Sequence, residues 1–332
     1  MDLTVVIPTR DRKSLLVETL GRLARQTGDP HFEVVVVDDG SADGSPAAVR
    51  ELAAREPLEV RLLEQPPLGP AAARNRALAA ARAPVCLFIN DDTWPRPDLV
   101  ERHARFHRDH PEPEAALLGS IVVPPDPPPT PFMEWLAEIN FDYEGIIVPD
   151  DAGGGRFFTA NVSAKTELVR DEGGFDESFP QAAHEDIDLG LRLEKRGMRL
   201  VYDLDAVVEH HHPLDLQSAI EREYDIGRSL AALVKRHPAW PVPRRPGARH
   251  WLKASGLTAL TAVGANTLWL KREVWRFLCH EAAREGYWSA VAGGDGAPSP
   301  ELRIGSRLSR LAMRDEDARS PARQPSAPGR HG

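Results

Sequence analysis

The chain has 332 residues, of which 42% are hydrophobic and 27% charged, a composition typical of a globular protein. Its 41 basic and 50 acidic residues give a net charge of −9, and no Lys/Arg block precedes the tail, so nucleic acid is not an expected partner. Cys86 and Cys279 are the only cysteines, which excludes a disulfide framework and a cysteine metal site. No signal-peptide pattern opens the sequence, and we expect a cytoplasmic protein.

The first half of the chain alternates short β-branched runs with helical patterns. Strands are predicted at residues 4–8, 33–39, 60–64 and 85–90. Helices are predicted between them, around the apolar face of Leu16, Leu20 and Leu23, and at residues 47–55 and 70–82. This order predicts an α/β fold with a Rossmann-like, mostly parallel sheet and helices on both faces.

The second half is introduced by the proline-rich stretch PPDPPPTP, residues 124–131. A helix is predicted from Glu185, with Gly197 as its C-terminal cap, followed by a strand in RLVYDLDAVVEHHH. An amphipathic helix is predicted at residues 216–236. We divide the chain into a nucleotide-binding half (1–123), an acceptor and catalytic half (124–215), C-terminal helices (216–291) and a disordered tail (292–332).

One apolar run is almost long enough to be a membrane-spanning helix. Residues 254–270 are 17 uncharged residues between Lys253 and Lys271, which is at the lower edge of a spanning length. The run contains Ser, Asn, Thr and Gly, and we predict a buried or interfacial helix, with a membrane span as the alternative.

Polar residues directly follow three of the predicted strands. They are Thr9-Arg10-Asp11, Asp38-Asp39-Gly40-Ser41 and Asn90-Asp91-Asp92. In parallel sheets ligands bind beyond the carboxyl ends of the strands, so these groups should meet on one rim. The adjacent carboxylates of Asp91 and Asp92 repel each other, and a bound cation would relieve that repulsion. We therefore predict a site at this rim.

Seven motifs along the chain carry a resemblance. In chain order they are VVIPTRDR, VVVVDDGS, GPAAARNRAL, INDD, GGFDESF, HEDIDLGLR and AVVEHHH. Each motif is weak alone, but together, in this order, they resemble the family 2 inverting glycosyltransferases, which have the GT-A fold and use nucleotide sugars. The resemblance covers about two thirds of the chain, from Val5 to His212.

The resemblance implies roles for residues on the donor side. Asp92 and His210 would hold a divalent metal, Mg²⁺ or Mn²⁺, that neutralises the diphosphate. The nucleotide sugar would be bound by Pro8, Thr9, Asp11, Asp39, Arg74, Asn75 and Asp91. Asn90 departs from the Asp that is usual in the family, which could lower the affinity for the metal.

The resemblance also implies an acidic pair that deprotonates the acceptor hydroxyl. Asp186 is the predicted base and Glu185 the alternate, although an acidic first helical turn also complements a helix dipole.

Residues 210–212 are three consecutive histidines, and neighbours on a strand point to opposite faces, so all three cannot bind one ion. We expect His211 and His212 at the surface. Trp135 is a candidate for acceptor binding.

We therefore expect transfer of a single sugar, with inversion, from a nucleotide-diphosphate sugar to a glycan, a lipid-linked or a small-molecule acceptor. Gln217 does not begin the Q-x-x-R-W sequence of processive synthases. The alternatives are a nucleotide-sugar-binding protein without turnover and a nucleotidyltransferase. Residues 216–236 and 254–270 leave peripheral contact with the inner face of the membrane open.

Overall fold

The structure is a computed structural model of the whole chain. It describes residues 1–126, 128–141, 143–179, 183–212, 214–245, 248–262 and 267–293. The chain divides into two compact units, one made of Met1–Pro213 and Ala232–Trp240 and the other of Leu214–Ala231 and the residues from Pro241 onward. The predicted disorder of the tail concerns residues that lie almost entirely outside the described part.

The first unit is built on an eight-stranded sheet in the order β3-β2-β1-β4-β7-β6-β8-β5. The strands are β1 (Leu3–Thr9), β2 (Phe32–Asp38), β3 (Val60–Glu64), β4 (Val85–Ile89), β5 (Thr93–Pro95), β6 (Ala115–Val122), β7 (Asn161–Lys165) and β8 (Arg199–His210). The four predicted strands are confirmed as β1 to β4, and they pair in parallel. The sheet as a whole is mixed, because β7 runs antiparallel to both β4 and β6, and β5 runs antiparallel to β8.

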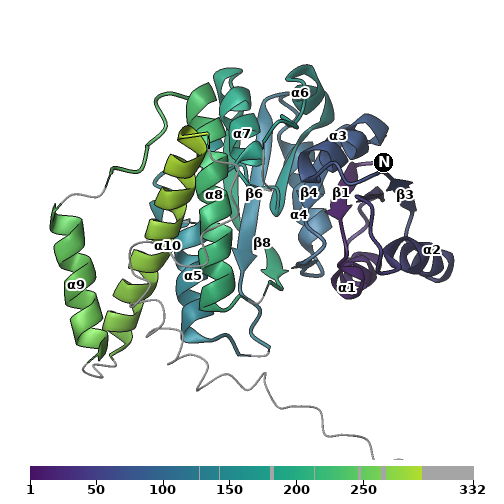
Figure 1. Cartoon of the computed structure of the whole chain (residues 1–332). Coiled ribbons are helices and arrows are strands. Elements are labelled where there is room, and N and C mark those ends of the chain that lie inside the picture. The colour runs from purple at the N-terminus through teal and green to yellow at the C-terminus, as the bar shows by residue number, and fades with distance from the viewer. Residues whose placement is uncertain are drawn as a thin grey trace, which may run out of the picture. The chain divides into compact units, whose positions relative to one another are not determined.

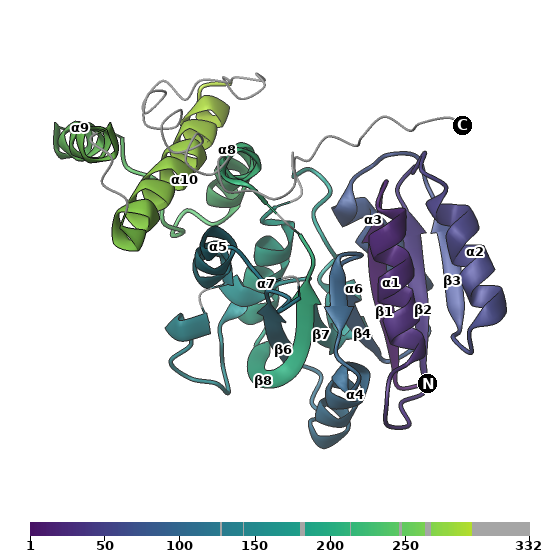
Figure 2. The same ribbon diagram turned by 90° about the horizontal axis from the view of Figure 1, so that it is seen from below.

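Helices cover both faces of this sheet, as predicted (Figures 1 and 2). On one face lie α1 (Lys13–Ala24), α2 (Ser45–Arg55) and α4 (Leu99–Asp109). On the other lie α3 (Pro70–Ala80), α6 (Thr166–Asp171) and α7 (Glu185–Lys195). Successive residues of a strand point to opposite faces of the sheet. In β1, Val5 and Ile7 pack on the side of α1, whereas Val6 packs on the side of α3. Burial on both faces explains why these strands read as unbroken apolar runs.

Shorter elements complete the first unit. They are α5 (Pro131–Phe141) and the 3-10 turns η1 (Tyr143–Gly145) and η2 (Gly154–Arg156). The predicted cap of α7 is confirmed, because Gly197 has a φ of 91° and its N–H bonds the carbonyl of Glu194.

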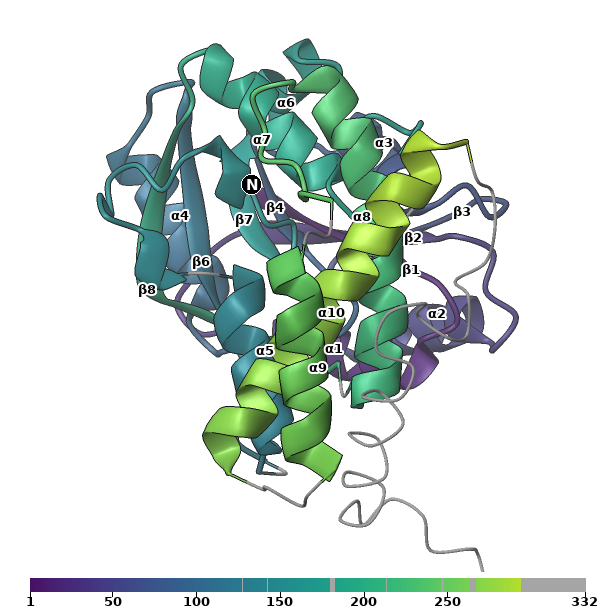
Figure 3. The ribbon, with the colours of Figure 1, turned by 60° about the vertical axis from the view of Figure 1, so that its left-hand side comes forward.

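The second unit contains residues 216–231 of α8 (Leu216–Arg236), together with α9 (Ala248–Ala262) and α10 (Leu268–Val291). The predicted amphipathic helix is confirmed by α8. Gly227 of α8 and Gly286 of α10 have no room for a side chain, since an added Cβ would meet the backbone of the facing helix. Helix α9 packs beside α10 (Figure 3).

The prediction of a single helix over residues 254–270 is wrong. Helix α9 ends at Ala262 and α10 begins at Leu268, where the Thr267 side chain accepts the N–H of Leu270 as an N-cap. The uncharged run is therefore divided between two helices. Within the described residues, no helix is both long and apolar enough to cross a membrane.

Helix α7 approaches η2 so closely that only glycine fits at the contact. A Cβ on Gly190 would collide with the carbonyl oxygen of Gly154 and with the Cβ of Phe157. This backbone contact sets the position of the helix whose first turn carries Glu185 and Asp186.

We expect Gly190→Ala to lower the free energy of unfolding by about 1–3 kcal/mol, because overpacking forces the backbone apart. Gly21→Ala in α1 is the matched control: its Cβ would lie 3.4 Å from the flexible end of Arg25, and alanine favours the helix. Urea denaturation of both variants measures the difference. Equal stabilities of the two variants would contradict the proposed contact.

Candidate active site

The polar strand ends meet at one edge of the sheet, as their parallel order predicts. Strands β1, β2 and β4 end at Thr9, Asp38 and Ile89. The hydroxyl of Thr9 donates to Asp91 Oδ2 at 2.8 Å, and the Thr9 carbonyl accepts the N–H of Asp39 at 2.9 Å. Three segments far apart in the sequence therefore form one polar rim.

Asp91 and Asp92 lie in the turn between β4 and β5, and both are nearly fully buried. Burial and the neighbouring Asp92 raise the pKa of Asp91 to about 6, although Arg12 and Thr9 oppose the shift. Burial also disfavours the ionised form of Asp92, but His210, His212 and Arg12 outweigh it and hold the pKa of Asp92 well below its usual range. Asp92 is thus the carboxylate that stays charged.

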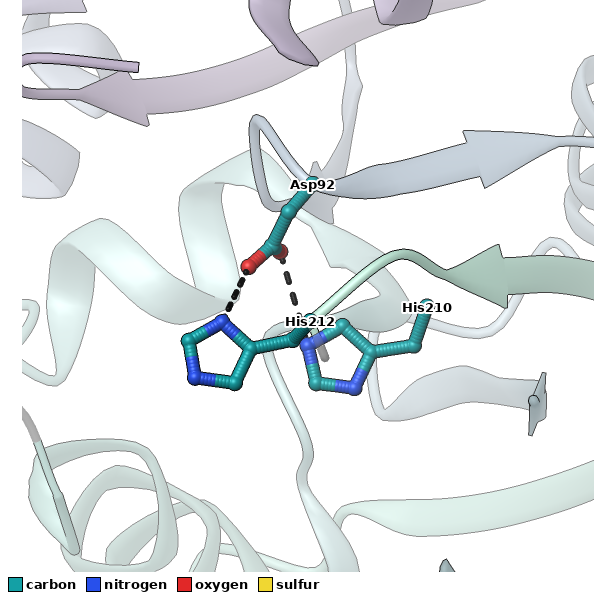
Figure 4. Close-up of side chains that lie close together, drawn as sticks. All are labelled: Asp92, His210 and His212. Carbon is teal, nitrogen blue, oxygen red and sulfur yellow. Dashed lines mark ion pairs between the residues drawn. The ribbon is translucent and has the colours of Figure 1, made fainter. Parts of the chain in front are cut away.

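Two of the three consecutive histidines face Asp92 (Figure 4). His210 Nε2 lies 3.5 Å from Asp92 Oδ1, and His212 Nδ1 lies 3.3 Å from Asp92 Oδ2. The ligand atoms of the three residues lie within 4.8 Å of one another. The backbone N–H of His211 donates to the Asp92 carbonyl at 2.7 Å, which fixes the end of β8 against the turn.

The expectation that His211 and His212 are surface residues is wrong. The side chain of His212 is 27% exposed and contacts Asp92, so it belongs to the cluster. The ring of His211 points the other way, as strand alternation predicts, and stacks on Trp94 with 3.3 Å between ring centroids. A carboxylate and two imidazoles are a donor set that fits a divalent transition ion, and Asp92 Oδ1 is buried without a hydrogen bond.

Arg12 is a member of the site that the motif analysis missed. Its guanidinium donates to Asp92 Oδ2 and lies 3.3 Å from Asp91 Oδ1. Burial lowers its pKa, but the two carboxylates outweigh this and raise it. The signal in the sequence was a basic residue three positions beyond the last residue of β1, in VVIPTRDR.

Asp39, one of the residues predicted to bind the nucleotide sugar, is hydrogen-bonded to the loop that follows β3. Its carboxylate accepts hydrogen bonds from the Gln65 side chain at 2.8 Å and from the N–H groups of Leu68 and Gly69 at 2.8 and 2.9 Å. Asp39 therefore shapes the polar rim by holding this loop. Pro8 lies in β1 opposite Val37 of β2.

Asp11 adopts a left-handed backbone with a φ of 52°. Its N–H donates to Ser41 Oγ at 2.9 Å, and its carboxylate accepts the N–H of Ala42 at 2.7 Å. The loops after β1 and β2 are thereby joined at the rim.

Arg74 connects the turn after β4 with the acidic helix α7. It is 5% exposed, and its Nη1 donates to Glu185 Oε1 at 2.8 Å while its Nη2 donates to Asn90 Oδ1 at 3.1 Å. The amide that replaces the usual carboxylate at position 90 thus accepts a hydrogen bond from a buried cation. The two halves of the predicted site are linked by this one side chain.

Asn75 supports the loop that precedes α7. Its side-chain amide donates to the Phe175 carbonyl and accepts the Phe175 N–H, both at 2.8 Å. The next residue of that loop, Asp176, accepts a hydrogen bond from Arg236 at 2.7 Å. A direct contact of Asn75 with the nucleotide stays a prediction.

The acidic pair at the start of α7 divides into a buried and an accessible member. Glu185 is 4% exposed, and its Oε1 accepts a hydrogen bond from Arg74. Asp186 is only partly buried: its Oδ1 accepts the Ile187 N–H at 2.8 Å, whereas its Oδ2 receives only long contacts of 3.3 and 3.4 Å from Thr159. The geometry therefore leaves Asp186 the freer carboxylate. Trp135, by contrast, is buried beside Phe132 and is not available for stacking on an acceptor.

Two family models match this chain. Glycosyl transferase family 2 matches residues 4–158, and glycosyl transferase family group 2 matches residues 85–268, more than half of the chain. The chain belongs to the family 2 glycosyltransferases. The motifs that carried the resemblance are the segments that meet at the rim and at the start of α7.

Relatives of this family 2 glycosyltransferase have named activities. Validoxylamine A glucosyltransferase of Streptomyces hygroscopicus subsp. limoneus is 30% identical over 284 residues, which cover 73% of this chain and 60% of the relative. Pre-mycofactocin glycosyltransferase of Mycobacterium tuberculosis is 32% identical over 247 residues, which cover 73% of this chain and 49% of the relative. The chain thus spans about half to three fifths of these relatives.

Solved structures share the fold. The mannosyltransferase PcManGT from Pyrobaculum calidifontis, in complex with GDP-Man and Mn²⁺, aligns with a TM-score of 0.54 at 21% identity, over 96% of this chain and 81% of that one. Residues 1–349 of Staphylococcus aureus TarS, in complex with UDP, align with a TM-score of 0.51 at 19% identity, over 88% and 92%. At these identities the likeness shows the GT-A fold.

The environment of Glu185 predicts a pH-dependent stability. Burial and Asp186 raise its pKa from 4.5 to about 7, against the pull of Arg74. In that window the folded chain binds a proton that the unfolded chain releases, so the free energy of unfolding contributed by Glu185 falls as the pH rises. In Glu185→Gln this contribution is absent, and we expect the variant's free energy of unfolding, minus that of the parent, to increase with pH.

Urea denaturation across this pH window measures that difference. A constant offset between the two proteins would mean that Arg74 keeps Glu185 ionised throughout.

Proposed function

We propose that this protein transfers a single sugar from a nucleotide-diphosphate sugar to an acceptor hydroxyl, with inversion and with a divalent metal. The observation that carries the proposal is the bridge made by Arg74, which joins the Asn90–Asp92 turn to the acidic start of α7. A donor-binding turn beside a helix with an accessible carboxylate is the arrangement that such a transfer needs.

On the donor side, Asp92, His210 and His212 are the residues that would hold the metal. The bound ion would neutralise the charge of the departing diphosphate. Two imidazoles in the donor set favour Mn²⁺ over Mg²⁺, which prefers oxygen ligands. The complex of PcManGT with GDP-Man and Mn²⁺ supports the same choice.

On the acceptor side, Asp186 would take the proton of the acceptor hydroxyl while that oxygen attacks the anomeric carbon. The bond from the anomeric carbon to the diphosphate oxygen breaks, and the nucleoside diphosphate leaves with the bonding electrons. Glu185, held by Arg74, would position the first turn of α7 without touching the reacting atoms. Burial raises its pKa, so part of the population carries a proton near neutral pH.

We propose a class of acceptor and no single compound. The named relatives act on validoxylamine A and a pre-mycofactocin, and TarS is a poly(ribitol-phosphate) β-N-acetylglucosaminyltransferase, which supports small-molecule and glycan acceptors alike. A nucleotide-sugar-binding protein without turnover would bind the donor and release no product. A nucleotidyltransferase would release pyrophosphate from a nucleoside triphosphate, whereas the proposed transferase releases a nucleoside diphosphate.

Peripheral contact with an anionic membrane is a further part of the proposal. The exposed large apolar side chains of the second unit include Leu252 and Leu260 of α9 and Leu268 and Trp269 at the start of α10. The basic residues Arg244, Arg245 and Lys253 are also exposed. Exposed apolar and basic side chains together are typical of helices at a bilayer surface. Such contact would bring the enzyme to a lipid-linked acceptor.

Two variants test the assigned roles. Thermal shifts measured with nucleotides and nucleotide sugars, with and without Mn²⁺, identify the donor, because a ligand of the folded state raises the melting temperature. We expect Asp92→Ala to lose the Mn²⁺-dependent part of that shift. We expect Asp186→Asn to keep the shift and to lose about 10²-fold or more of the transfer rate, the usual size of a general-base effect.

Asp171→Asn, at an exposed position of α6, is the control and should match the parent in both assays. Turnover of Asp186→Asn at the parental rate would refute the base assignment.

Membrane contact is tested by flotation with vesicles that contain an anionic lipid. We expect the parent to float with them, and Trp269→Glu to float several-fold less, because it places a carboxylate at the proposed surface. Leu204→Glu changes an equally exposed apolar residue of the first unit and should float like the parent. A parent that stays wholly in the soluble fraction would remove this part of the proposal.

A further inference from the structure

Arg12 lies where the positive charge of a bound ion would act. Its Nη1 atom contacts Asp92 Oδ2 and lies 3.3 Å from Asp91 Oδ1, and its Nη2 atom lies 3.5 Å from His212 Nδ1. Asp92 and His212 are two of the three residues whose ligand atoms come together. Arg12 therefore interacts with the same groups that would hold the metal.

Arg12 and a bound metal ion would compete for Asp92 and His212. Asp92 Oδ2 faces His212 Nδ1 at 3.3 Å, so an ion held by these two atoms would meet the guanidinium that donates to the same oxygen. Two cations at one carboxylate repel each other, most strongly where little water screens them. Metal binding is thus opposed for as long as the guanidinium stays at Asp92.

The surroundings of Arg12 allow its side chain to move while its backbone stays in place. On one side, the N–H of Asp11 donates to Ser41 Oγ at 2.9 Å. On the other, the N–H of Lys13 donates to Asp43 Oδ2 at 2.8 Å. The Arg12 side chain itself is 37% exposed, unlike the carboxylates that it contacts. A long side chain with an exposed path is free to exchange partners.

We propose that Arg12 is an exchangeable counter-ion that couples metal binding to donor binding. Without metal, its guanidinium balances the charges of Asp91 and Asp92. When the metal and the donor are bound, it pairs with the diphosphate, whose oxygens a guanidinium binds through two parallel hydrogen bonds. The metal then binds weakly alone and more tightly with a nucleoside diphosphate, and the coupling is reciprocal. This inference rests on the proposed function.

The experiment is a Mn²⁺ titration of the protein without nucleotide, in which electron paramagnetic resonance reports the free ion. We expect Arg12→Gln to bind Mn²⁺ about tenfold more tightly than the parent, because no cation has to be displaced. In the presence of UDP or GDP, whichever nucleotide stabilises the parent, the parent's Mn²⁺ affinity should increase by a larger factor than that of Arg12→Gln.

Two further variants support the comparison. Arg10→Gln removes an exposed arginine that lies 3.9 Å from Asp11, and it should leave Mn²⁺ affinity unchanged. Arg12→Lys keeps one positive charge but lacks the fork that contacts two carboxylates, so its affinity for Mn²⁺ should lie between those of the parent and Arg12→Gln. It also provides the test if the Gln variant, with two buried carboxylates left unbalanced, does not fold.

A Mn²⁺ affinity for Arg12→Gln or Arg12→Lys that is equal to or lower than the parental value overturns the inference. So does the absence of Mn²⁺ binding in parent and variants alike. The second outcome would also remove Mn²⁺ from the proposed function. Sugar transfer itself is judged separately, by product formation in the parent and in the Asp186→Asn variant.

Discussion

Two adjacent carboxylates buried at the end of a strand are the constraint on which this site depends. Asp91 and Asp92 are almost fully withdrawn from water, and the cost of burying unpaired charges amounts to several kcal/mol per ion. Positive or hydrogen-bonding groups must therefore gather around them. The fold brings Arg12 from the loop after β1, and His210 and His212 from the end of β8.

A buried carboxylate at the start of α7 is also balanced by a positive side chain. Arg74 is a buried cation that donates to both Asn90 and Glu185, so the Asn90–Asp92 turn and α7 are joined by hydrogen bonds of 3.1 and 2.8 Å. The neighbouring Asp186 accepts the Ile187 N–H through Oδ1, and its Oδ2 receives only long contacts from Thr159. Glu185 thus links the turn to α7, and Asp186 is the more exposed carboxylate of the pair. The glycine contact between α7 and η2 keeps that first turn in place.

Some parts of the fold and of the site could be predicted from the sequence, because a local pattern of residues determines them. Strands β1, β2 and β4 are buried on both faces and are therefore mainly apolar, and the polar residues that follow them lie on the shared edge. Helix α8 shows its amphipathic period directly. The mixed pairing of β5 to β8 had no such signal, because strand direction depends on how the chain returns to the sheet. The start of α10 at Leu268 is marked in the sequence only by its N-capping residue, Thr267.

The sequence by itself therefore determined the α/β half, the family and the chemical identity of the acidic turn and the acidic helix start, because these follow from local periodicity and from motifs in a fixed order. Only the tertiary structure decided which charges neutralise which. Arg12 and His212 are 80 and 120 positions from Asp92, and their contacts with it depend on which strands lie side by side and on the direction of each side chain. Coulomb interactions act over distances in space, and separation along the chain does not reveal them.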